Sequence, residues 1–252
     1  MNKMLYPNEK GEMEAYDMNL KNCYQIILDE DELNRFIDWL PDLEENEAYY
    51  CALFTRKKYS DTDKHPWIKA DKNHIKRFTS TKERLVDKIK QLEVPIGNFV
   101  VKGKEKTRFV VPQDSLALYI TPNPRDLWKA TIQGICDLAQ VVKCQGKNSN
   151  PHQEVLSTIQ RSHSSPKRVV TFDIDEKDDK ILDEVVKICG MAVDVVETRG
   201  GYHILVHSKE MPKHEKWYQK LSKFADVTGD ALLPIPGTFQ GGFCPKFIIK
   251  NH

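Results

Sequence analysis

The sequence lacks the features that mark secreted and membrane-spanning proteins. Residues 1–19 are polar and contain no apolar segment of the signal-peptide type. No run approaches the ~18 apolar residues that a membrane span requires. The six cysteines include no Cys-x-x-Cys pair, which argues against a disulfide framework, so we expect reduced thiols. These absences predict a cytoplasmic protein without a membrane partner.

An excess of one charge sign is also lacking, because the formal net charge is only +1. Bulk charge therefore does not favour nucleic acid as a partner, but the placement of charge is more informative. Between residues 56 and 90 there are 12 Lys and Arg residues against 5 Asp and Glu residues. This excess predicts either a phosphate-facing surface or a solvated helical face. The candidate nucleic-acid contacts are Lys57, Lys58, Lys76 and Arg77, with Tyr59, Trp67 and Phe78 as candidate stacking groups.

What is present is the composition of an ordinary globular protein, with 40% hydrophobic and 30% charged residues among 252. We predict three parts. Residues 1–45 form an acidic, weakly structured lead-in with one amphipathic helix near Glu30–Trp39. Residues 46–150 form an N-terminal α/β module, and residues 151–252 form a palm of strands and helices.

The middle part is predicted from its local patterns. Apolar, aromatic-rich runs and alternation indicate strands, and apolar residues at helical spacing indicate helices. The predicted elements are a strand at Tyr49–Thr55, a charged helix at Asn73–Leu92, a hairpin at residues 98–111, a strand at Leu116–Ile120 and a helix at Leu127–Val142 capped by Asp126.

The last part alternates strands and helices in the order β-α-β-β-α-β, the ferredoxin-like arrangement. Its predicted elements are Arg168–Ile174, Asp178–Cys189 closed by Gly190, Val193–Thr198, Tyr202–His207, Lys213–Phe224, and strand-like stretches at Ala231–Ile235 and Lys246–Ile249. RNA-recognition modules and polymerase palms both use this order. The fold class is therefore α+β, but it does not select a function.

Two carboxylates end the first strand of this part. Asp173 and Asp175 are two residues apart, and alternation along a strand directs both side chains to one face. Such a pair repels unless a cation lies between its members, and hard oxygen ligands suit Mg²⁺ or Mn²⁺ carrying a substrate phosphate. The alternative is an acidic turn that simply meets solvent. The pattern predicts a metal site with both aspartates as ligands and catalytic groups.

A glycine-containing turn precedes His203. In Arg199-Gly200-Gly201-Tyr202-His203 the two glycines leave backbone N–H groups accessible to phosphates, and the imidazole can donate a hydrogen bond to them. In the β-α-β-β-α-β order the first and third strands are neighbours. We therefore expect His203 to share a cleft with the two aspartates. The candidate nucleotide-binding residues are Arg199, Gly200, Gly201, His203 and, from a later strand, Lys246.

These motifs together resemble those of the archaeo-eukaryotic primase superfamily, which includes replicative primases, plasmid and viral primase-polymerases and end-joining polymerases. The hhDhD motif is matched at residues 170–175 and the small-x-His hairpin at residues 199–203. The third family motif is one acidic residue on a later strand, often near a Pro-Gly-Thr segment. Here that segment is Pro236-Gly237-Thr238, and the third ligand is Asp230 or, as the alternative, Asp226. The family's usual Arg before this segment is absent, with Pro234 close to its place.

The resemblance implies a primase-type fold and two-metal nucleotidyl transfer with Mg²⁺ or Mn²⁺. It further implies a single-stranded nucleic-acid template, an NTP or dNTP substrate, and a separate helicase or replication protein as partner. The implied location is a bacterial cell, with phages and mobile elements among the sources of such genes. It covers residues 167–238 and matches nothing specific in the first hundred residues.

Two other functions compete with this interpretation. A rolling-circle nickase also uses a ferredoxin-like palm, and residues 202–207 contain His203 and His207, although four residues separate them. A non-catalytic RNA-recognition-type module uses the same fold but needs exposed aromatic residues on its central strands. Here those strands carry acidic residues, which favours the polymerase.

Overall fold

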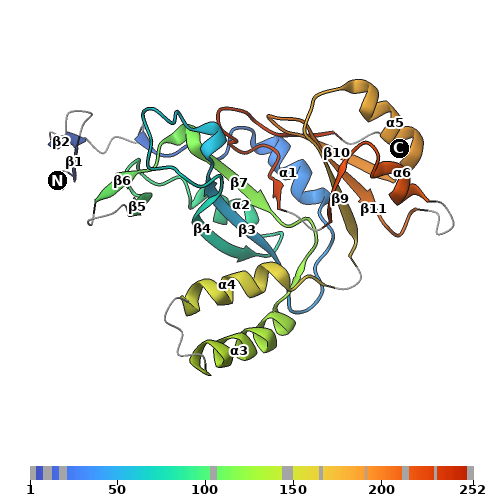
Figure 1. The fold of residues 1–252 in the computed structure, drawn as a ribbon, viewed down its shortest axis with the longest axis horizontal. Coiled ribbons are helices and arrows are strands. Elements are labelled where there is room, and N and C mark those ends of the chain that lie inside the picture. The colour runs from blue at the N-terminus through green and yellow to red at the C-terminus, as the bar shows by residue number, and fades with distance from the viewer. Residues whose placement is uncertain are drawn as a thin grey trace.

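The computed structural model describes residues 4–7, 13–16, 22–102, 107–143, 150–164, 167–190, 192–211, 216–229 and 232–248. It is a mixed α+β structure in which every strand pairing among these residues is antiparallel. Figure 1 shows two main sheets side by side, with helix α1 between them and a helical hairpin projecting from the first sheet. No helix among the described residues is long and apolar enough to cross a membrane.

The first sheet has the strand order β13-β7-β3-β4. Its centre is β3 (Glu47–Thr55), paired with β7 (Leu116–Ile120) and β4 (Asn73–Ser80), and β8 (Arg125–Asp126) pairs with the start of β3. The predicted strands at Tyr49–Thr55 and Leu116–Ile120 are confirmed. Both are buried on their two faces, which explains their nearly unbroken apolar sequences.

The charged helix predicted at Asn73–Leu92 is wrong over its first half. Residues 73–80 form β4, and only Leu85–Lys90 form a helix, α2. The sequence Asn-His-Ile-Lys-Arg-Phe-Thr-Ser is rich in β-branched and aromatic residues, and pairing with β3 supplies the backbone hydrogen bonds. The high density of charge concealed this alternation.

The second sheet has the strand order β12-β9-β11-β10-β14. Its elements are β9 (Val169–Ile174), α5 (Asp179–Cys189), β10 (Val193–Glu197), β11 (Tyr202–His207), α6 (Trp217–Leu221), β12 (Asp226–Gly229) and β14 (Lys246–Ile248). The predicted strands and helix at 168–207 are confirmed, including the end of α5 at Gly190, which has φ +59°. Asp178, expected as the first helical residue, is the N-cap, and its carboxylate accepts from the Lys180 amide. The predicted adjacency of the first and third strands, β9 and β11, is also confirmed.

The end of the chain differs from the sequence prediction. The helix expected at Lys213–Phe224 is described only as the short α6, because residues 212–215 lie outside the described residues. The strand that follows it is β12, which begins at Asp226, while Leu233–Pro234 forms β13 and pairs with β7 of the first sheet. The chain therefore leaves the second sheet after β12 and returns with β14.

One core joins the two sheets. Helix α1 (Glu30–Trp39) begins at Asp29, whose carboxylate accepts a hydrogen bond from the Glu32 amide, and it buries Leu33, Phe36 and Ile37. These side chains share one cluster with apolar residues of β3, β7, β9, β10, β11 and β14. The segment from Tyr24 to Leu40 therefore belongs to the core and is not a weakly structured lead-in.

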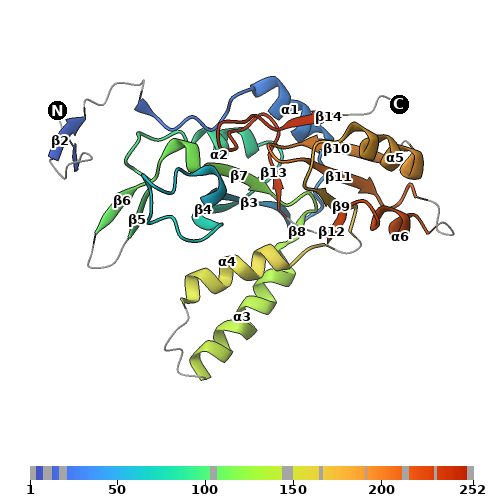
Figure 2. The ribbon, with the colours of Figure 1, turned by 45° about the horizontal axis from the view of Figure 1, so that its top comes forward.

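The other faces of the sheets are covered separately. Helices α5 and α6 cover the second sheet, where Phe172, Val195 and Ile204 pack beneath them. The helical hairpin of α3 (Leu127–Lys143) and α4 (Pro151–Arg161) projects from the first sheet (Figure 2). The predicted helix at Leu127–Val142 and its cap are confirmed, since Asp126 accepts a hydrogen bond from the Lys129 amide at 2.8 Å. The outer face of α3 is apolar and exposed.

Two small hairpins complete the described fold. Strands β5 (Val100–Lys102) and β6 (Arg108–Val110) confirm the hairpin predicted at residues 98–111. Strands β1 (Met4–Pro7) and β2 (Met13–Tyr16) pair near the N-terminus.

Candidate active site

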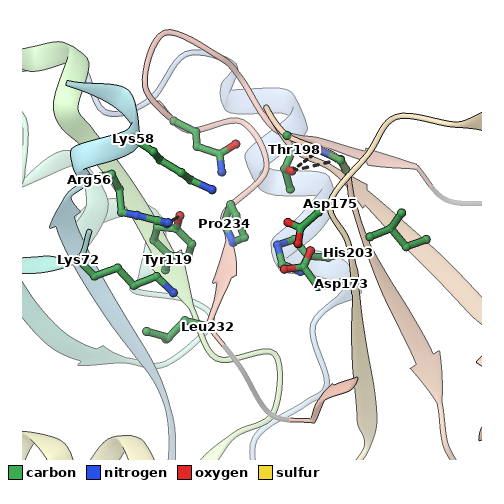
Figure 3. A pocket seen from close by; sticks show the side chains of 14 residues that line it. Arg56, Lys58, Lys72, Tyr119, Asp173, Asp175, Thr198, His203, Leu232 and Pro234 are labelled. Atoms are coloured by element: carbon green, nitrogen blue, oxygen red, sulfur yellow. Dashed lines mark hydrogen bonds and ion pairs between the residues drawn. The ribbon is translucent and has the colours of Figure 1, made fainter. Parts of the chain in front are cut away.

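A pocket lies between the two sheets, and each sheet supplies one wall (Figure 3). The second sheet contributes an acidic wall with Asp173, Asp175 and His203. The first sheet and its connections contribute a basic wall of Arg56, Lys58 and Lys72, with Tyr119 beside them. The pocket is also lined by Thr198, Gly200, Gly201, Leu232, Pro234 and Gln240.

The strand register builds the acidic wall. Asp173 on β9 lies directly opposite His203 on β11 and, on its other side, directly opposite Asp226 on β12. Residues directly opposite in an antiparallel pair share one face of the sheet. The row Asp226–Asp173–His203 therefore crosses three adjacent strands on the face that meets the first sheet. Asp175, two residues beyond Asp173, lines the same pocket, as its spacing predicts.

The charge on this wall is concentrated. Burial raises the pKa of the Asp173 carboxyl, and the nearby Asp175 and Asp226 carboxylates act in the same direction, while Lys58 and Lys72 across the pocket oppose them. A raised pKa means that the charged form is costly here without a further cation. Among the described residues no group of three or more His, Cys, Asp or Glu side chains is arranged to hold a metal ion by itself. Asp230 lies outside the described residues, so Asp226 is the described candidate for a third ligand.

His203 is neutral at physiological pH. Burial lowers the pKa of its imidazole to about 4, and Lys58 and Lys72 contribute to this shift. Its Nδ1 atom lies 3.5 Å from the nearer carboxylate oxygen of Asp173, and 13% of its side chain is exposed. A neutral imidazole has one N–H donor, which can serve an anionic ligand in the pocket.

The turn before His203 lies directly against the end of β9. The Thr198 hydroxyl donates to the Gly201 carbonyl and accepts from the Gly201 amide, which holds the turn closed. A Cβ atom on Gly201 would lie 1.8 Å from the Ile174 carbonyl oxygen, whereas one on Gly200 would meet no atom within 4 Å. Gly201 is therefore required for the approach that brings the turn beside Asp175.

The basic wall is partly fixed in place. Arg56, at the end of β3, is buried, and its guanidinium pairs with the Asp71 carboxylate at 2.9 Å and donates to the Tyr119 hydroxyl. Lys58 lies in the short 3₁₀ helix η2 (Lys57–Tyr59), and its ammonium is 5.3 Å from the centre of the Tyr59 ring. The ammonium of Lys72 is 5.9 Å from the centre of the Tyr119 ring.

The two lysines of this wall are exposed, so their charges are accessible to a ligand. Among the described residues neither Lys58 nor Lys72 forms a salt bridge with a carboxylate. Burial and the Arg56 guanidinium lower the pKa of Lys72, which indicates crowding of positive charge. The wall thus favours an anion with several charges in the space between the sheets.

Several sequence candidates lie outside this pocket. The Arg199 side chain donates to the Gly241 carbonyl at 2.6 Å and covers the Tyr59 ring, so it ties the two sheets together. Lys246 is on the edge strand β14 and does not line the pocket. Lys57 and Lys76 are exposed, and Arg77 on β4 donates to Ser157 of α4.

The aromatic residues of the basic segment are packing groups. Tyr59 is buried, Trp67 stacks on Phe109 with ring centres 5.3 Å apart, and Phe78 packs against the main core. Stacking on a template by these rings is therefore not supported. Of the basic candidates in this segment, Lys58 alone lines the pocket.

The Pro236–Gly237–Thr238 segment supports α1. The Gly237 carbonyl accepts hydrogen bonds from the Leu28 and Asp29 amides, and its φ is +76°. A Cβ atom there would lie 2.3 Å from the Asp29 carbonyl oxygen. This segment therefore holds the beginning of α1 and does not line the pocket.

The sequence prediction omitted Arg56 and Lys72 as site residues, and Tyr119 and Gln240 with them. Arg56, Lys72 and Tyr119 were hidden because they lie about 50 or more residues before the first motif, and no local spacing links them to the aspartates. Gln240 closely follows Thr238, but nothing in the local sequence directs it to the pocket. The available signal for the basic wall was the set of basic residues that follows the buried strand β3. The excess of Lys and Arg at residues 56–90 reflects part of this signal, but it does not identify which of them line the pocket.

His207 serves the packing of β11. Its Nε2 atom lies 2.9 Å from the Asp194 carboxylate, which also accepts from the indole of Trp39 at 2.7 Å. Four residues along a strand span ~13 Å, so His203 and His207 do not share a metal. The histidine pair of a nickase is therefore not formed.

Comparisons with known proteins identified no relative of this chain. No family model, no curated protein and no solved structure matches the chain.

Proposed function

We propose that the protein is a template-directed nucleotidyltransferase that makes or extends primers, a primase-polymerase. The observation that carries the proposal is the pocket between the sheets, where Asp173 and Asp175 face Lys58, Lys72 and Arg56. A nucleoside triphosphate has the matching charge pattern, because its phosphates need cations on one side and a metal on the other. The neutral His203 supplies an N–H donor between the two walls.

Topology supports the same class. The order β9-α5-β10-β11-α6-β12 with strand arrangement β12-β9-β11-β10 is that of a ferredoxin-like domain. In the motifs that resemble the archaeo-eukaryotic primase superfamily, Asp173 lies on β9, Asp175 follows its last residue and His203 lies on β11. In this proposal the first sheet is the N-terminal module of that fold, and it supplies the basic wall.

The residues present fit a divalent cation. Two converging carboxylates, of which Asp173 has a raised pKa and is therefore costly to ionise without a nearby cation, suit Mg²⁺ or Mn²⁺, and Asp226 is opposite Asp173. Protein sites for Mg²⁺ commonly use one or two carboxylates and complete the coordination with water and substrate phosphates. This agrees with the absence of a closed three-ligand cluster in the described part of the chain. When bound, the cation would supply Lewis-acid stabilisation of charge on the phosphates.

The chain's own side chains then have distinct tasks. Lys58, Lys72 and Arg56 bind the β- and γ-phosphates and orient the triphosphate. His203 donates a hydrogen bond to a phosphate oxygen. In the reaction a 3′-hydroxyl oxygen bonds to the α-phosphorus, the bond from that phosphorus to pyrophosphate breaks, and the hydroxyl proton is lost to solvent. Asp173 and Asp175 would hold the divalent cation beside the phosphates.

A non-catalytic RNA-recognition role is less well supported. Such modules stack bases on exposed aromatic residues of the central strands. On the central strands here, Phe172 and Tyr202 are buried beneath α5 and α6. The opposite face meets the first sheet, and the pocket on it is lined by carboxylates, which repel a nucleic-acid backbone.

Nucleotide binding tests the proposal through a matched pair of lysines. Lys58→Ala removes a pocket cation, whereas Lys57→Ala removes its exposed neighbour. Titration of a nucleoside triphosphate with Mn²⁺ should show about tenfold weaker binding for Lys58→Ala, as expected for a lost charged hydrogen bond. Lys57→Ala should bind as the wild type does. Equal affinities of all three proteins would overturn the assignment.

A further inference from the structure

A second cavity adjoins the acidic wall on the side away from the basic wall. It has a volume of about 310 Å³ and is lined by residues 173–176 of β9 and its continuation and by residues 222–226 between α6 and β12. The two cavities share Asp173, Ile174 and Asp175. Because β12 and β11 flank β9 on opposite sides, the cavities lie on opposite sides of the carboxylates.

The surface that leads to this cavity combines positive charge and exposed rings. Lys216, Lys220 and Lys223 are exposed and recur at helical spacing along α6 and the turn after it. Tyr218 is 44% exposed and Phe224 is 41% exposed, which is unusual for large aromatic side chains. Lysines interleaved with exposed aromatic residues are typical of surfaces that bind single-stranded nucleic acid.

Two other groups of rings in the described part of the chain are alternatives to this surface: those of the basic segment, and Trp128 of α3, which is exposed beside Lys129 and Arg161 but lines a separate cavity that contains neither Asp173 nor Asp175. The aromatic residues of the basic segment at 56–90 are packed, whereas Phe224 is exposed and lines the cavity. The lysine row spans ~10 Å along the helix axis. That length covers about three nucleotides at ~3.4 Å each.

The charged side chains around the second cavity determine which part of a nucleic-acid strand can bind at each place. Lys223 and Phe224 line the cavity from the segment between α6 and β12, whereas Asp173, Asp175, Glu176 and Asp226 line it from β9, its continuation and the start of β12. Phosphates therefore bind along the lysines, and an uncharged hydroxyl end of the strand reaches the carboxylates. In nucleotidyl transfer the attacking hydroxyl and the leaving pyrophosphate lie on opposite sides of the reacting phosphorus.

We infer that this second cavity receives the 3′-terminal nucleotide of the primer strand. Phe224 stacks on its base, and Lys223, Lys220 and Lys216 bind the phosphates behind it. The inference rests on the proposed function, because it assigns the nucleophile of that same reaction. The proposed nucleic-acid-binding surface is then formed by α6 and the start of β12, and not by the segment at 56–90.

Photocrosslinking locates the strand end without any chemistry by the protein. The probe is a duplex with a recessed 3′ end that carries 5-iododeoxyuridine as its last nucleotide, without added nucleoside triphosphate. The crosslink should map to the peptide that contains Phe224 and should be lost in Phe224→Leu. A crosslink to β4, to α3 or to any other peptide would overturn the inference.

Equilibrium binding provides the second measurement. Phe224→Ala should weaken binding of the recessed-end duplex about tenfold, the effect of one lost base–aromatic stack. The triple change Lys216→Gln, Lys220→Gln and Lys223→Gln should lower the slope of log affinity against log salt by roughly 0.7–0.9 per lost phosphate contact. Lys187→Gln on α5 is the control, since that lysine pairs with Glu184. A triple variant with the wild-type slope contradicts the assignment.

These results separate the two proposals. If the wild type incorporates nucleotides and the crosslink maps elsewhere, only the primer-terminus site fails. If the crosslink maps to Phe224 and no nucleotide is incorporated under any metal, the strand site stands and the polymerase function fails.

Discussion

At the scale of single residues, the protonation state of His203 is set by its surroundings. The imidazole is buried beside Asp173 and faces two lysines, which keeps it neutral and leaves one N–H donor. His203→Ala should weaken nucleoside triphosphate binding about tenfold, since hydrogen bonds to charged groups contribute roughly 1.5–3 kcal/mol. Isothermal titration with Mn²⁺ present measures this. An unchanged affinity in a correctly folded variant would remove His203 from the nucleotide site.

His207 on the same strand should affect stability rather than activity. Its hydrogen bond to Asp194 raises its pKa, although burial opposes this, and Trp39 and Glu210 are its other neighbours. A raised folded-state pKa gives stability that is present below the unfolded value of about 6.5 and is lost as pH rises through the folded value. The free energy of unfolding of the wild type, relative to that of His207→Gln, should therefore fall by on the order of 1 kcal/mol between pH 6 and pH 8.5. Urea denaturation at the two pH values checks this, and a difference that grows with pH would contradict it.

At the scale of elements, the turn between β10 and β11 depends on one of its two glycines. Gly201→Ala forces a Cβ atom against the Ile174 carbonyl and so displaces the strand end that carries Asp175. Gly200→Ala places its Cβ in open space and is the matched control. We expect Gly201→Ala to lose nucleotide binding and about 1–3 kcal/mol of stability, while Gly200→Ala stays within about 0.5 kcal/mol of the wild type. Thermal unfolding and nucleotide titration of the pair decide this, and equal behaviour of the two variants would refute it.

The individual strands differ in how well the sequence predicted them. The hairpin at residues 193–207 and the strand before Asp173 were predictable because their alternation and turn glycines are local signals. Strand β4 was not, because its charged residues mask a two-residue period that only pairing with β3 makes decisive. Strand β13 was assigned to the wrong sheet, since two residues, Leu233 and Pro234, give no information about their partner strand. The residues of the acidic wall are close together in the sequence and were predicted. The basic wall was not, because its residues reach the pocket only through the packing of the first sheet against the second.

At the scale of the whole molecule, the two sheets should fold as one unit. Phe36 of α1 is fully buried and packs against Trp39 and against Phe247 of β14, within the core that both sheets share. Phe36→Ala should cost about 3–5 kcal/mol and still give a single unfolding transition. Ile132→Ala on the exposed face of α3, where the side chain is 53% exposed, is the control and should change stability by less than about 0.5 kcal/mol. Two separate calorimetric transitions in the wild type would contradict the shared core.

The proposed activity of the whole molecule is nucleotide transfer at the acidic wall. The most direct measurement is incorporation of a labelled NTP or dNTP on a single-stranded template with Mg²⁺ or Mn²⁺, comparing the wild type with Asp173→Asn and Asp183→Asn. Asp183 is exposed on α5 and lies outside both cavities, so its variant controls for charge and folding. We expect metal-dependent products from the wild type and from Asp183→Asn. Asp173→Asn should lose several kcal/mol of transition-state stabilisation, on the order of a 10³-fold lower rate. Absence of product from the wild type with either metal, or full activity of Asp173→Asn, would contradict the account.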